Sequence, residues 1–589
     1  MTTPDATLEA RWRALAERSL NGAPLARLQS RLPGGLLLEP LHTAASAPPG
    51  ARLACPRPAA RWDIRQRLAQ GSAQEANAIA LEELEGGAGS LEIAVAAPGG
   101  GPGVALAGPA DFEALTAEWL LDFAPLALDA DRPEPSAWLL AFAKRRGLLE
   151  ARFAFNRDPL GGALRDGALA EPLEQAVAFA RDVVAQFPNA TALRLDARPV
   201  HEAGGSEAQE LGAALGAAAA YLRAGLAPEL LLRMAPVAVS LGADAFVEIA
   251  KLRAVRLVFA RLAEICGAPE AMVRLHAASG RRMFTRRDPW VNQLRLTTAG
   301  FAAAAGGADV VTLLPPTEAL GQSTAFSRRL ARNAHTILIE ESHLGQVADP
   351  GAGAFAIEAA AERLAEAGWA VFQAIEQAGG VLAALESGWL AREIGAVRAQ
   401  REEAVRRRKA ALTGVSEFPL LGERTLEAPP WPAGPVAGGL APFRLAEPFE
   451  ALRDRAERAG APPVFLATLG ALADFSPRAQ FAANLFAAGG LASLAAEQQH
   501  ADDTALAAAF RASDARAACL CGSDGAYAER AQGAAQALKA AGCTLLAYAG
   551  RPGEQEAMLR AAGVDLFLFA GGDAVEALER MQQALGVQP

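Results

Sequence analysis

The 589-residue chain has few of the features that mark secreted, membrane-spanning or nucleic-acid-binding proteins. Its five cysteines are an odd number without regular spacing, which argues against a disulfide framework. No uncharged apolar run reaches the roughly 18 residues that a membrane-spanning helix needs. The N-terminal segment is polar and mixed in charge, so we expect no signal peptide. These absences favour a protein of the reducing cytoplasm.

A basic surface is also missing. The chain has 56 Lys and Arg against 66 Asp and Glu, and its formal net charge is −10. One basic cluster, at residues 401–409, is interleaved with glutamates and is typical of a solvated helix face. The charge balance therefore argues against a nucleic-acid partner.

The chain contains alternating strand and helix patterns in two stretches. Residues 1–60 hold one amphipathic helix and a Pro/Gly-rich extended arm, and the first alternating stretch follows at 61–395. We predict strands there at 90–95, 192–196, 237–241, 273–276, 309–314 and 336–339, and helices at 72–85, 173–186, 208–224, 245–266, 292–305, 324–334 and 356–378. Alternation of this length predicts a parallel sheet, and eight such units close a barrel.

The second alternating stretch is shorter. Residues 396–460 form a predicted interdomain linker, in which four prolines at 429, 430, 432 and 435 are too closely spaced for a helix or a central strand. Strands and helices then alternate through 461–589, which predicts a doubly wound, flavodoxin-like domain. Its ligand crevice is expected near residues 469–474 and 522–525, at the carboxyl ends of two strands.

Residues 335–358 carry the most informative local pattern. The short apolar run 336–339 has the composition of a buried strand, and Glu340 and Glu341 follow it before a turn rich in Gly, Pro and Asp. The polar end of a barrel strand is where barrels keep their chemistry. We nevertheless interpret the two glutamates as structural acids that pair with nearby arginines, and not as general bases.

Several separate motifs link the chain to one family. They are WDIRQR at 62–67, EIAKLRA at 248–254, RDPWVN at 287–292, SRRLARN at 327–333 and EESHLGQVADP at 340–350. Together they closely resemble motifs of the methylmalonyl-CoA mutases, in the family's order, over about residues 60–589. The resemblance implies an α/β fold in which a (β/α)8 TIM-type barrel, threaded by the acyl-CoA, is followed by a flavodoxin-like cobalamin-binding domain.

The family's cobalamin motif is altered in this chain. Residues 468–477 align with it through Gly470, and Asp474 then stands where the family has its cobalt-ligating histidine. Thr468 replaces a lysine, Leu472 replaces the aspartate that orients the histidine, and Pro477 replaces a glycine. A carboxylate is a poor substitute for imidazole on cobalt, and leucine cannot orient a ligand. We therefore expect that this domain binds no cobalamin.

The barrel positions are altered as well. Pro199 stands where the family has a catalytic histidine, and Arg67 stands where it has an active-site tyrosine. Residues 313–315, Leu-Leu-Pro, replace small polar residues of the bore, and leucines that point inward would fill the passage for the acyl-CoA. Arg65 could retain a contact to an anion.

Two histidines lie near altered positions. His201 follows Pro199 by two residues, and we do not assign it the role of the missing histidine. His500 is the only histidine of residues 461–589, and we interpret it as an ordinary surface residue.

The resemblance is therefore to the non-catalytic small (β) subunit of heterodimeric mutases. It assigns no catalytic, cofactor-binding or metal-binding residue to this chain, and no bound cofactor. Adenosylcobalamin and the interconversion of (R)-methylmalonyl-CoA and succinyl-CoA would belong to the large (α) subunit. We expect the arm at residues 20–60 to wrap around that partner.

Two other functions stay open from the sequence. The first is a stand-alone acyl-CoA isomerase or lyase with new chemistry, for which His201, Arg67, Arg198 and Glu341 are the candidates and a continuous barrel channel is the discriminating feature. The second is a chaperone-like module that associates transiently with a cobalamin enzyme.

Overall fold

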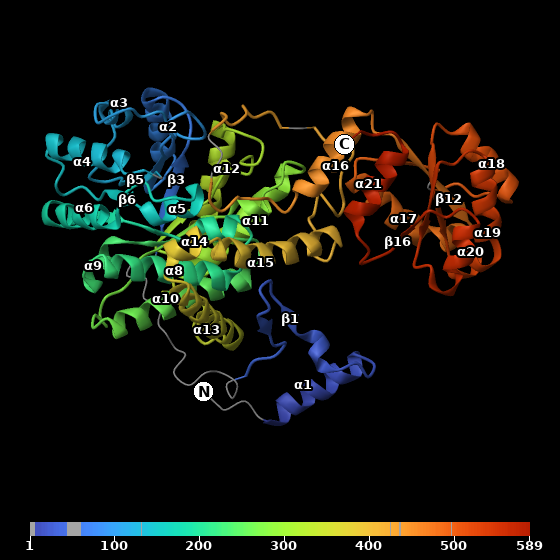
Figure 1. The fold of residues 1–589 in the computed structure, drawn as a ribbon, viewed down its shortest axis with the longest axis horizontal. Helices are drawn as coiled ribbons and strands as arrows, with labels where there is room; N and C mark the ends of the chain where they lie inside the picture. The colour runs from blue at the N-terminus through green and yellow to red at the C-terminus, as the bar shows by residue number, and fades with distance from the viewer. Residues whose placement is uncertain are drawn as a thin grey trace. The chain divides into compact units, whose positions relative to one another are not determined.

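The computed structural model describes residues 6–43, 61–130, 132–424, 426–434, 438–495 and 497–588 (Figure 1). The chain divides into two compact units. The first comprises Met1–Phe284, Asn292–Arg398 and Glu427–Phe443, and the second comprises Thr285–Val291, Ala399–Leu426 and Arg444–Pro589. Within the predicted linker 396–460, the proline-rich stretch Glu427–Phe443 belongs to the first unit, while Ala399–Leu426 and the residues from Arg444 onward belong to the second.

The first unit is built on a parallel sheet of nine strands that curls into a nearly closed barrel. Its strands are β3 (Asp63–Leu68), β4 (Ser90–Ala94), β5 (Leu126–Asp129), β6 (Ala154–Arg157), β7 (Thr191–Leu193), β8 (Leu195–Asp196), β9 (Val237–Leu241), β10 (Leu275–Ser279) and β11 (Val310–Thr312). The order is β7-β6-β5-β4-β3-β11-β10-β9-β8. Since only Arg194 separates β7 from β8 in the chain, the two ends of this order meet, and the predicted TIM-type barrel is confirmed.

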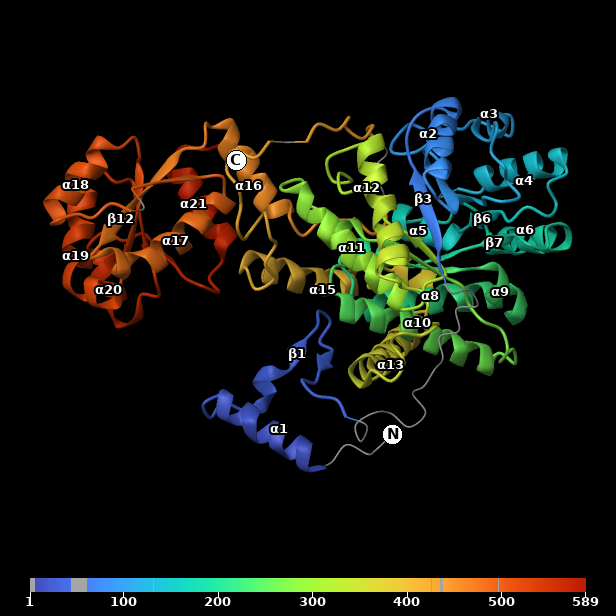
Figure 2. The ribbon, with the colours of Figure 1, turned by 180° about the vertical axis from the view of Figure 1, so that it is seen from behind.

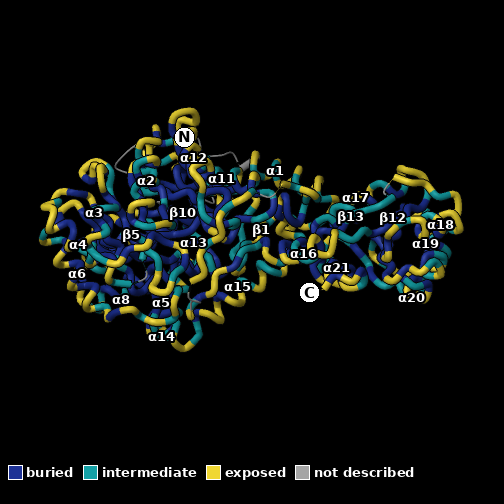
Figure 3. Tube along the Cα trace, turned by 90° about the horizontal axis from the view of Figure 1, so that it is seen from above, coloured by how far each residue is buried: buried dark blue, intermediate teal, exposed yellow. Residues whose placement is uncertain are grey.

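Helices surround the strands on the outside (Figure 2). They are α2 (Ala73–Glu85), α3 (Asp111–Leu115), α4 (Glu134–Arg146), α5 (Pro159–Asp166), α6 (Leu173–Gln186), α7 (Arg198–Glu202), α8 (Glu207–Arg223), α9 (Pro228–Met234), α10 (Ala245–Ile265), α11 (Pro289–Ala305), α12 (Ala325–Thr336), α13 (Phe355–Gln377), α14 (Val381–Glu386) and α15 (Trp389–Arg406). Local signals fix several starts: Ser72 and Glu75 form a capping box at α2, and Ser206 and Gln209 form one at α8. The strands are the most deeply buried part (Figure 3).

The second unit is a doubly wound sheet, as predicted. Its strands are β12 (Pro463–Leu469), β13 (Ala492–Leu494), β14 (Ala517–Gly522), β15 (Leu545–Ala549) and β16 (Leu566–Leu568), and its helices are α16 (Glu447–Arg458), α17 (Leu472–Ala488), α18 (Asp503–Ala512), α19 (Asp524–Ala540), α20 (Glu556–Ala561) and α21 (Ala574–Ala584). The parallel order β13-β12-β14-β15-β16 is the flavodoxin-like order. Cys519 and Cys521 are fully buried on one face of β14, with α17 and α21.

The strand predicted at 336–339 is wrong. Helix α12 continues to Thr336, and a π-helical turn, η3 (Ile337–Glu341), follows it. Leu338 and Ile339, which are adjacent in the chain, are both buried, whereas alternate residues share a face in a strand. A four-residue apolar run cannot by itself distinguish a strand from the buried end of a helix. The barrel strands β3, β5 and β6 were absent from the predicted set.

The N-terminal arm is partly attached to its own barrel. After α1 (Ala6–Ser19) and the short 3₁₀ helix η1 (Leu25–Leu28), an antiparallel pair forms between β1 (Ser30–Arg31) and β2 (Leu37–Leu38). Arg363 of α13 donates a hydrogen bond to the carbonyl oxygen of Leu37 at 2.6 Å. No side chain from Leu8 to Ser19 is buried. Residues 44–60 lie outside the described residues, so the wrapping of a partner by residues 20–60 stays a prediction.

None of the described helices combines the length and the apolar character that crossing a bilayer requires.

Candidate functional site

The carboxyl ends of the barrel strands surround a small polar cavity. It has a volume of about 230 Å³, and its walls include Arg67, Asp129, Arg198, Pro199 and Leu314. Three positions that the sequence singled out, Arg67, Pro199 and Leu314, therefore meet at this mouth. The proline offers a ring without a hydrogen-bond donor to the cavity.

Arg194 closes the barrel interior below this cavity. It lies between β7 and β8 and is 1% exposed. Its Nη2 atom is 2.8 Å from Asp129 Oδ1 and 3.2 Å from Asp196 Oδ2, and its Nη1 atom is 3.5 Å from Glu92 Oε1. One guanidinium thus contacts carboxylates from three strands, β4, β5 and β8.

Two further arginines complete this cluster from above. Arg67 Nη2 is 3.2 Å from Asp129 Oδ2, and Arg198 Nη2 is 2.7 Å from Asp196 Oδ2 and 3.1 Å from Asp129 Oδ1. We call the six residues, Arg67, Glu92, Asp129, Arg194, Asp196 and Arg198, the charged layer. Burial acts to raise the pKa of Asp129, but the arginines outweigh it and hold that pKa well below its ordinary value. Burial also acts to raise the pKa of Asp196, and Arg198 and Arg194 again outweigh it, so this pKa is lowered too.

A second cavity lies at the amino ends of the strands. It has a volume of about 390 Å³ and is lined by residues that include Arg65, Arg152, Arg194 and His276. Arg194 thus lines the lower cavity, while its ion-pair partner Asp129 lines the upper one. The charged layer separates the two cavities and fills the axis of the barrel between them.

The leucines at 313 and 314 point to opposite sides. Leu314 lines the upper cavity. Leu313 packs outward, since a Cβ atom placed on Gly300 of α11 would lie 3.0 Å from Leu313 Cδ1. Thr312, one residue earlier, points inward, and its Oγ1 atom is 2.9 Å from His276 Nε2. Strand alternation is expected to aim only some of residues 313–315 inward; of the two leucines, Leu314 points into the bore and Leu313 away from it, and the charged layer supplies most of the filling.

His201 lies on a different polar cluster. It is buried in α7, and its Nδ1 atom is 3.8 Å from Glu210 Oε2. The same carboxylate is 2.9 Å from Lys251 Nζ, which also contacts Glu248 at 2.6 Å. Burial raises the pKa of Glu210 to about 7, against the opposing effect of Lys251. Glu248 and Lys251 of the EIAKLRA motif therefore belong to a buried structural cluster.

The four candidates for new chemistry do not converge. Arg67 and Arg198 meet through Asp129, whereas His201 does not line the cavity and Glu341 is exposed in η3. Glu340 pairs with Arg61 at 2.7 Å, as predicted for a structural acid, although at a helix end and not at a strand end. Arg65 is buried and bonded to Ser90 and Asp63.

In the second unit, the carboxylate of Asp474 is used inside the chain. Its Oδ2 atom accepts a hydrogen bond from the backbone N–H of Ala471 at 2.9 Å, and its Oδ1 atom accepts one from Ser523 Oγ at 3.0 Å. Gly470 has a φ of +92°, and a Cβ atom there would lie 2.8 Å from Asp474 Oδ2. Gly470 therefore permits the turn that brings Asp474 back onto the start of α17.

The neighbouring positions have similar local roles. Leu472 is 51% exposed at the first position of α17, Thr468 donates a hydrogen bond from its hydroxyl to the carbonyl oxygen of Gln498, and Pro477 lies within the helix. His500 is half-buried and packs against the ring of Phe465, with ring centroids 6.0 Å apart.

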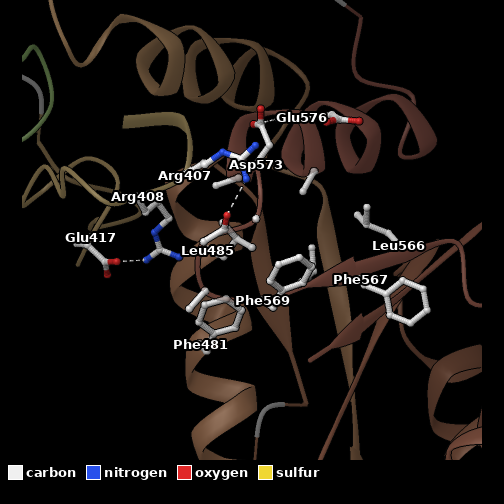
Figure 4. A pocket seen from close by; sticks show the side chains of 16 residues that line it. Arg407, Arg408, Glu417, Phe481, Leu485, Leu566, Phe567, Phe569, Asp573 and Glu576 are labelled. Carbon is white, nitrogen blue, oxygen red and sulfur yellow. Dashed lines mark hydrogen bonds and ion pairs between the residues drawn. The ribbon is translucent and has the colours of Figure 1, made fainter. Parts of the chain in front are cut away.

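A cavity of the second unit lies elsewhere. It has a volume of about 230 Å³ and lies beside the edge strand β16. Figure 4 shows Phe481 and Phe569 among the side chains that line it. Arg407 donates to the carbonyl oxygen of Gly571 at 3.0 Å, and Arg408 pairs with Glu417 at 2.5 Å. None of the lining residues belongs to the crevice predicted at 469–474 and 522–525.

Comparison with known proteins gives a consistent result. The sequence pattern described as "Methylmalonyl-CoA mutase" matches residues 57–429. The chain is 41% identical to the methylmalonyl-CoA mutase small subunit of Streptomyces virginiae, over 99% of this chain and 97% of that protein. It is 37% identical to the probable small subunit of Mycobacterium tuberculosis (strain H37Rv), over 89% and 85% of the two chains. It is also 37% identical to the small subunit of Propionibacterium freudenreichii subsp. shermanii, over 68% and 64%.

Proposed function

The chain belongs to the methylmalonyl-CoA mutase family, and from that membership we propose that it serves as the non-catalytic small subunit of a heterodimer. Its large-subunit partner binds adenosylcobalamin and interconverts (R)-methylmalonyl-CoA and succinyl-CoA. The names of the similar proteins from Streptomyces and Mycobacterium, both small subunits, support a larger partner. The four described cysteines are free thiols, which fits the reducing cytoplasm that the composition favours.

The use of Asp474 carries the proposal. Both of its carboxylate oxygens accept hydrogen bonds from within the second unit, and they hold together the start of α17 and the turn at Ser523. A metal ligand at this position would have to give up these bonds. Carboxylate oxygen is also a weak donor for cobalt compared with imidazole, and the exposed Leu472 cannot orient a ligand. The residues present therefore do not fit the corrin cofactor of the family.

The barrel supports the same proposal independently. The charged layer occupies the axis along which an acyl-CoA would pass, and Pro199 brings no donor that could polarise a thioester. Displacing one arginine of the layer would leave buried carboxylates uncompensated, which costs several kcal/mol. This arrangement argues against a stand-alone acyl-CoA isomerase or lyase, because such an enzyme needs an open passage and convergent polar groups.

The N-terminal segment, residues 1–60, is the proposed partner contact. Helix α1 presents Leu8 and Leu15, which are 61% and 54% exposed, on one face. An isolated helix of 14 residues is marginal in water without tertiary packing. A surface of the large subunit would provide that packing.

Purified subunits test this proposal. The full chain and the large subunit are produced together, separated, and assayed singly and after remixing for conversion of (R)-methylmalonyl-CoA with added adenosylcobalamin. We expect activity in the large-subunit fraction or the remixed complex and none in this chain alone. Turnover by this chain alone would contradict the proposal. Association that is lost on gel filtration of the co-expressed pair would favour a chaperone-like module.

A further inference from the structure

The outer face of α11 is unusual for a solvent-exposed barrel helix. From Asn292 to Ala305 its only ionisable residue is Arg295, which is buried. The face instead exposes Leu294 and Phe301, by 67% and 41%. Between them lie Thr297 and Thr298, whose hydroxyls donate to the carbonyl oxygens of Gln293 at 2.7 Å and Leu294 at 3.0 Å. Both threonine hydroxyls thus donate within the helix.

Helix α12 continues this face. Figures 1 and 2 show α11 and α12 next to each other. Gln293 Nε2 of α11 donates to the carbonyl oxygen of Leu330 of α12 at 3.4 Å. Lower down, a Cβ atom on Gly300 would lie 3.2 Å from Leu338 Cδ1. The two helices therefore run alongside each other for most of their length.

Helix α12 and the residue that follows it also expose apolar side chains. Phe326, in the first turn of α12, is 47% exposed, and Ile337, directly after its end, is 48% exposed. The only ionisable side chain exposed on α12 is Arg329, whose guanidinium lies 5.6 Å from the ring centroid of Phe326. We call Leu294, Thr297, Thr298, Phe301, Phe326, Arg329 and Ile337 the α11–α12 face.

Other helices of the same barrel carry charges on their outer faces. Helix α4 exposes Lys144, Arg145 and Arg146, and α6 exposes Glu174 and Asp182. The chain has an excess of acidic residues, yet none lies among the exposed residues of α11 and α12. Glu340 and Glu341 follow Ile337 in η3, and Glu340 is paired with Arg61. Depletion of charge together with exposed aromatic and aliphatic side chains is the composition of the core of a permanent protein interface.

We infer that the α11–α12 face docks the large subunit, an inference that rests on the proposed function. The part of the occupant that faces Leu294 and Phe301 is uncharged and apolar, because a charge buried there would stay unpaired. A single carboxylate on the partner, placed opposite Arg329, would complete the contact. A lipid surface is a poor occupant, since the face lacks the cluster of basic residues that membrane-surface helices carry.

Introducing negative charge at the centre of the face tests the inference. The double variant L294E/F301E is combined with the purified large subunit of the same heterodimer, and the dissociation constant is measured by calorimetry. We expect it to rise by about a hundredfold or more, because two carboxylates would be buried in an apolar contact. The matched control is L120E, since Leu120 is 68% exposed on the same unit, outside the face. It should bind like the wild type.

Each outcome is decisive. Unchanged binding by L294E/F301E, or equal loss by L120E, overturns the inference. Failure of the wild-type chain to bind any large subunit overturns the proposed function instead. Thermal unfolding of each variant alone checks its fold. If L294E/F301E does not fold, a photoreactive phenylalanine analogue at position 294 decides, because it should crosslink to the large subunit; crosslinking to a second copy of this chain, or to neither, contradicts the inference.

Discussion

At the scale of single residues, Asp474 and Arg67 both have a structural role in this chain. The resemblance of the sequence motifs implies a metal ligand of the family at the position of Asp474 and an active-site tyrosine at that of Arg67. In this chain the first residue stabilises the start of α17, and the second pairs with Asp129. A carboxylate near a helix N-terminus is favourable because it accepts unpaired backbone N–H groups and faces the positive end of the helix dipole. Both side chains therefore have local structural reasons to be there.

The variant D474A tests the role of Asp474. We expect the second unit to lose about 1 kcal/mol of its free energy of unfolding, because the N–H of Ala471 loses its acceptor. The matched control is D524A, whose side chain is 93% exposed and pairs only with Arg478 among the described ion pairs. It should change stability by less than about 0.5 kcal/mol. Equal effects of the two variants, followed by denaturant unfolding, would contradict this role.

The barrel interior contains a carboxyl whose ionisation depends on folding. Burial raises the pKa of Asp158 from 3.8 to about 6, while Arg194 opposes the shift and Asp196 adds to it. The folded chain therefore holds this proton more tightly than the unfolded chain. The corresponding stabilisation is fully present below about pH 4 and is lost as the pH rises through about 6.

The variant D158N removes this pH dependence. It should reduce the loss of stability between pH 4.5 and pH 7 by about 2 kcal/mol, because the pKa shift is worth about 3 kcal/mol in all and about 1 kcal/mol of it is already lost below pH 4.5. The readout is the slope of stability against pH in urea unfolding, because asparagine also disturbs the bonds from Gly161 and Asp196 at every pH. Glu210, with a pKa raised to about 7, stays in the variant and leaves part of the slope. An unchanged slope in D158N would contradict the assignment.

At the scale of elements, the strands and helices with a clear period were predictable. Strand β9 and helix α6 have the bounds that the sequence predicts, and every predicted helix of the barrel is present to within a few residues. The apolar run 336–339 failed because its length fits both a strand and the last turn of a helix. Short strands such as β5 and β13 have too few residues for their alternation to stand out.

Alanine substitutions in η3 distinguish the helical from the extended arrangement. Leu338 and Ile339 are buried and Ile337 is 48% exposed. L338A and I339A should each cost about 2–4 kcal/mol, whereas I337A should cost less than about 0.5 kcal/mol in the isolated chain. In a strand, 337 and 339 would share a face and behave alike. Equal costs for I337A and I339A in thermal unfolding would contradict the structure.

At the scale of the whole molecule, the architecture followed from the sequence but the filling of the barrel did not. The alternation of strands and helices predicts a barrel and a doubly wound sheet. The motifs that resemble those of the family indicate where this chain differs from it. The charged layer is built by single residues from separate strands, such as Glu92, Asp129 and Arg194, which are far apart in the chain. The sequence did offer one indication of the charged layer, namely charged residues at inward positions of short strands. Which of them pair cannot be predicted before the barrel is closed, because closure brings the strands together.

The central claim is that this chain does not bind the corrin cofactor of its family. The most direct test is a titration of the isolated full chain with adenosylcobalamin, in which the visible absorbance retained after gel filtration is measured. The account predicts no retained corrinoid by this chain, and retention by the large subunit under the same conditions. Retention of one corrinoid per chain, abolished by a substitution in residues 468–477, would contradict it.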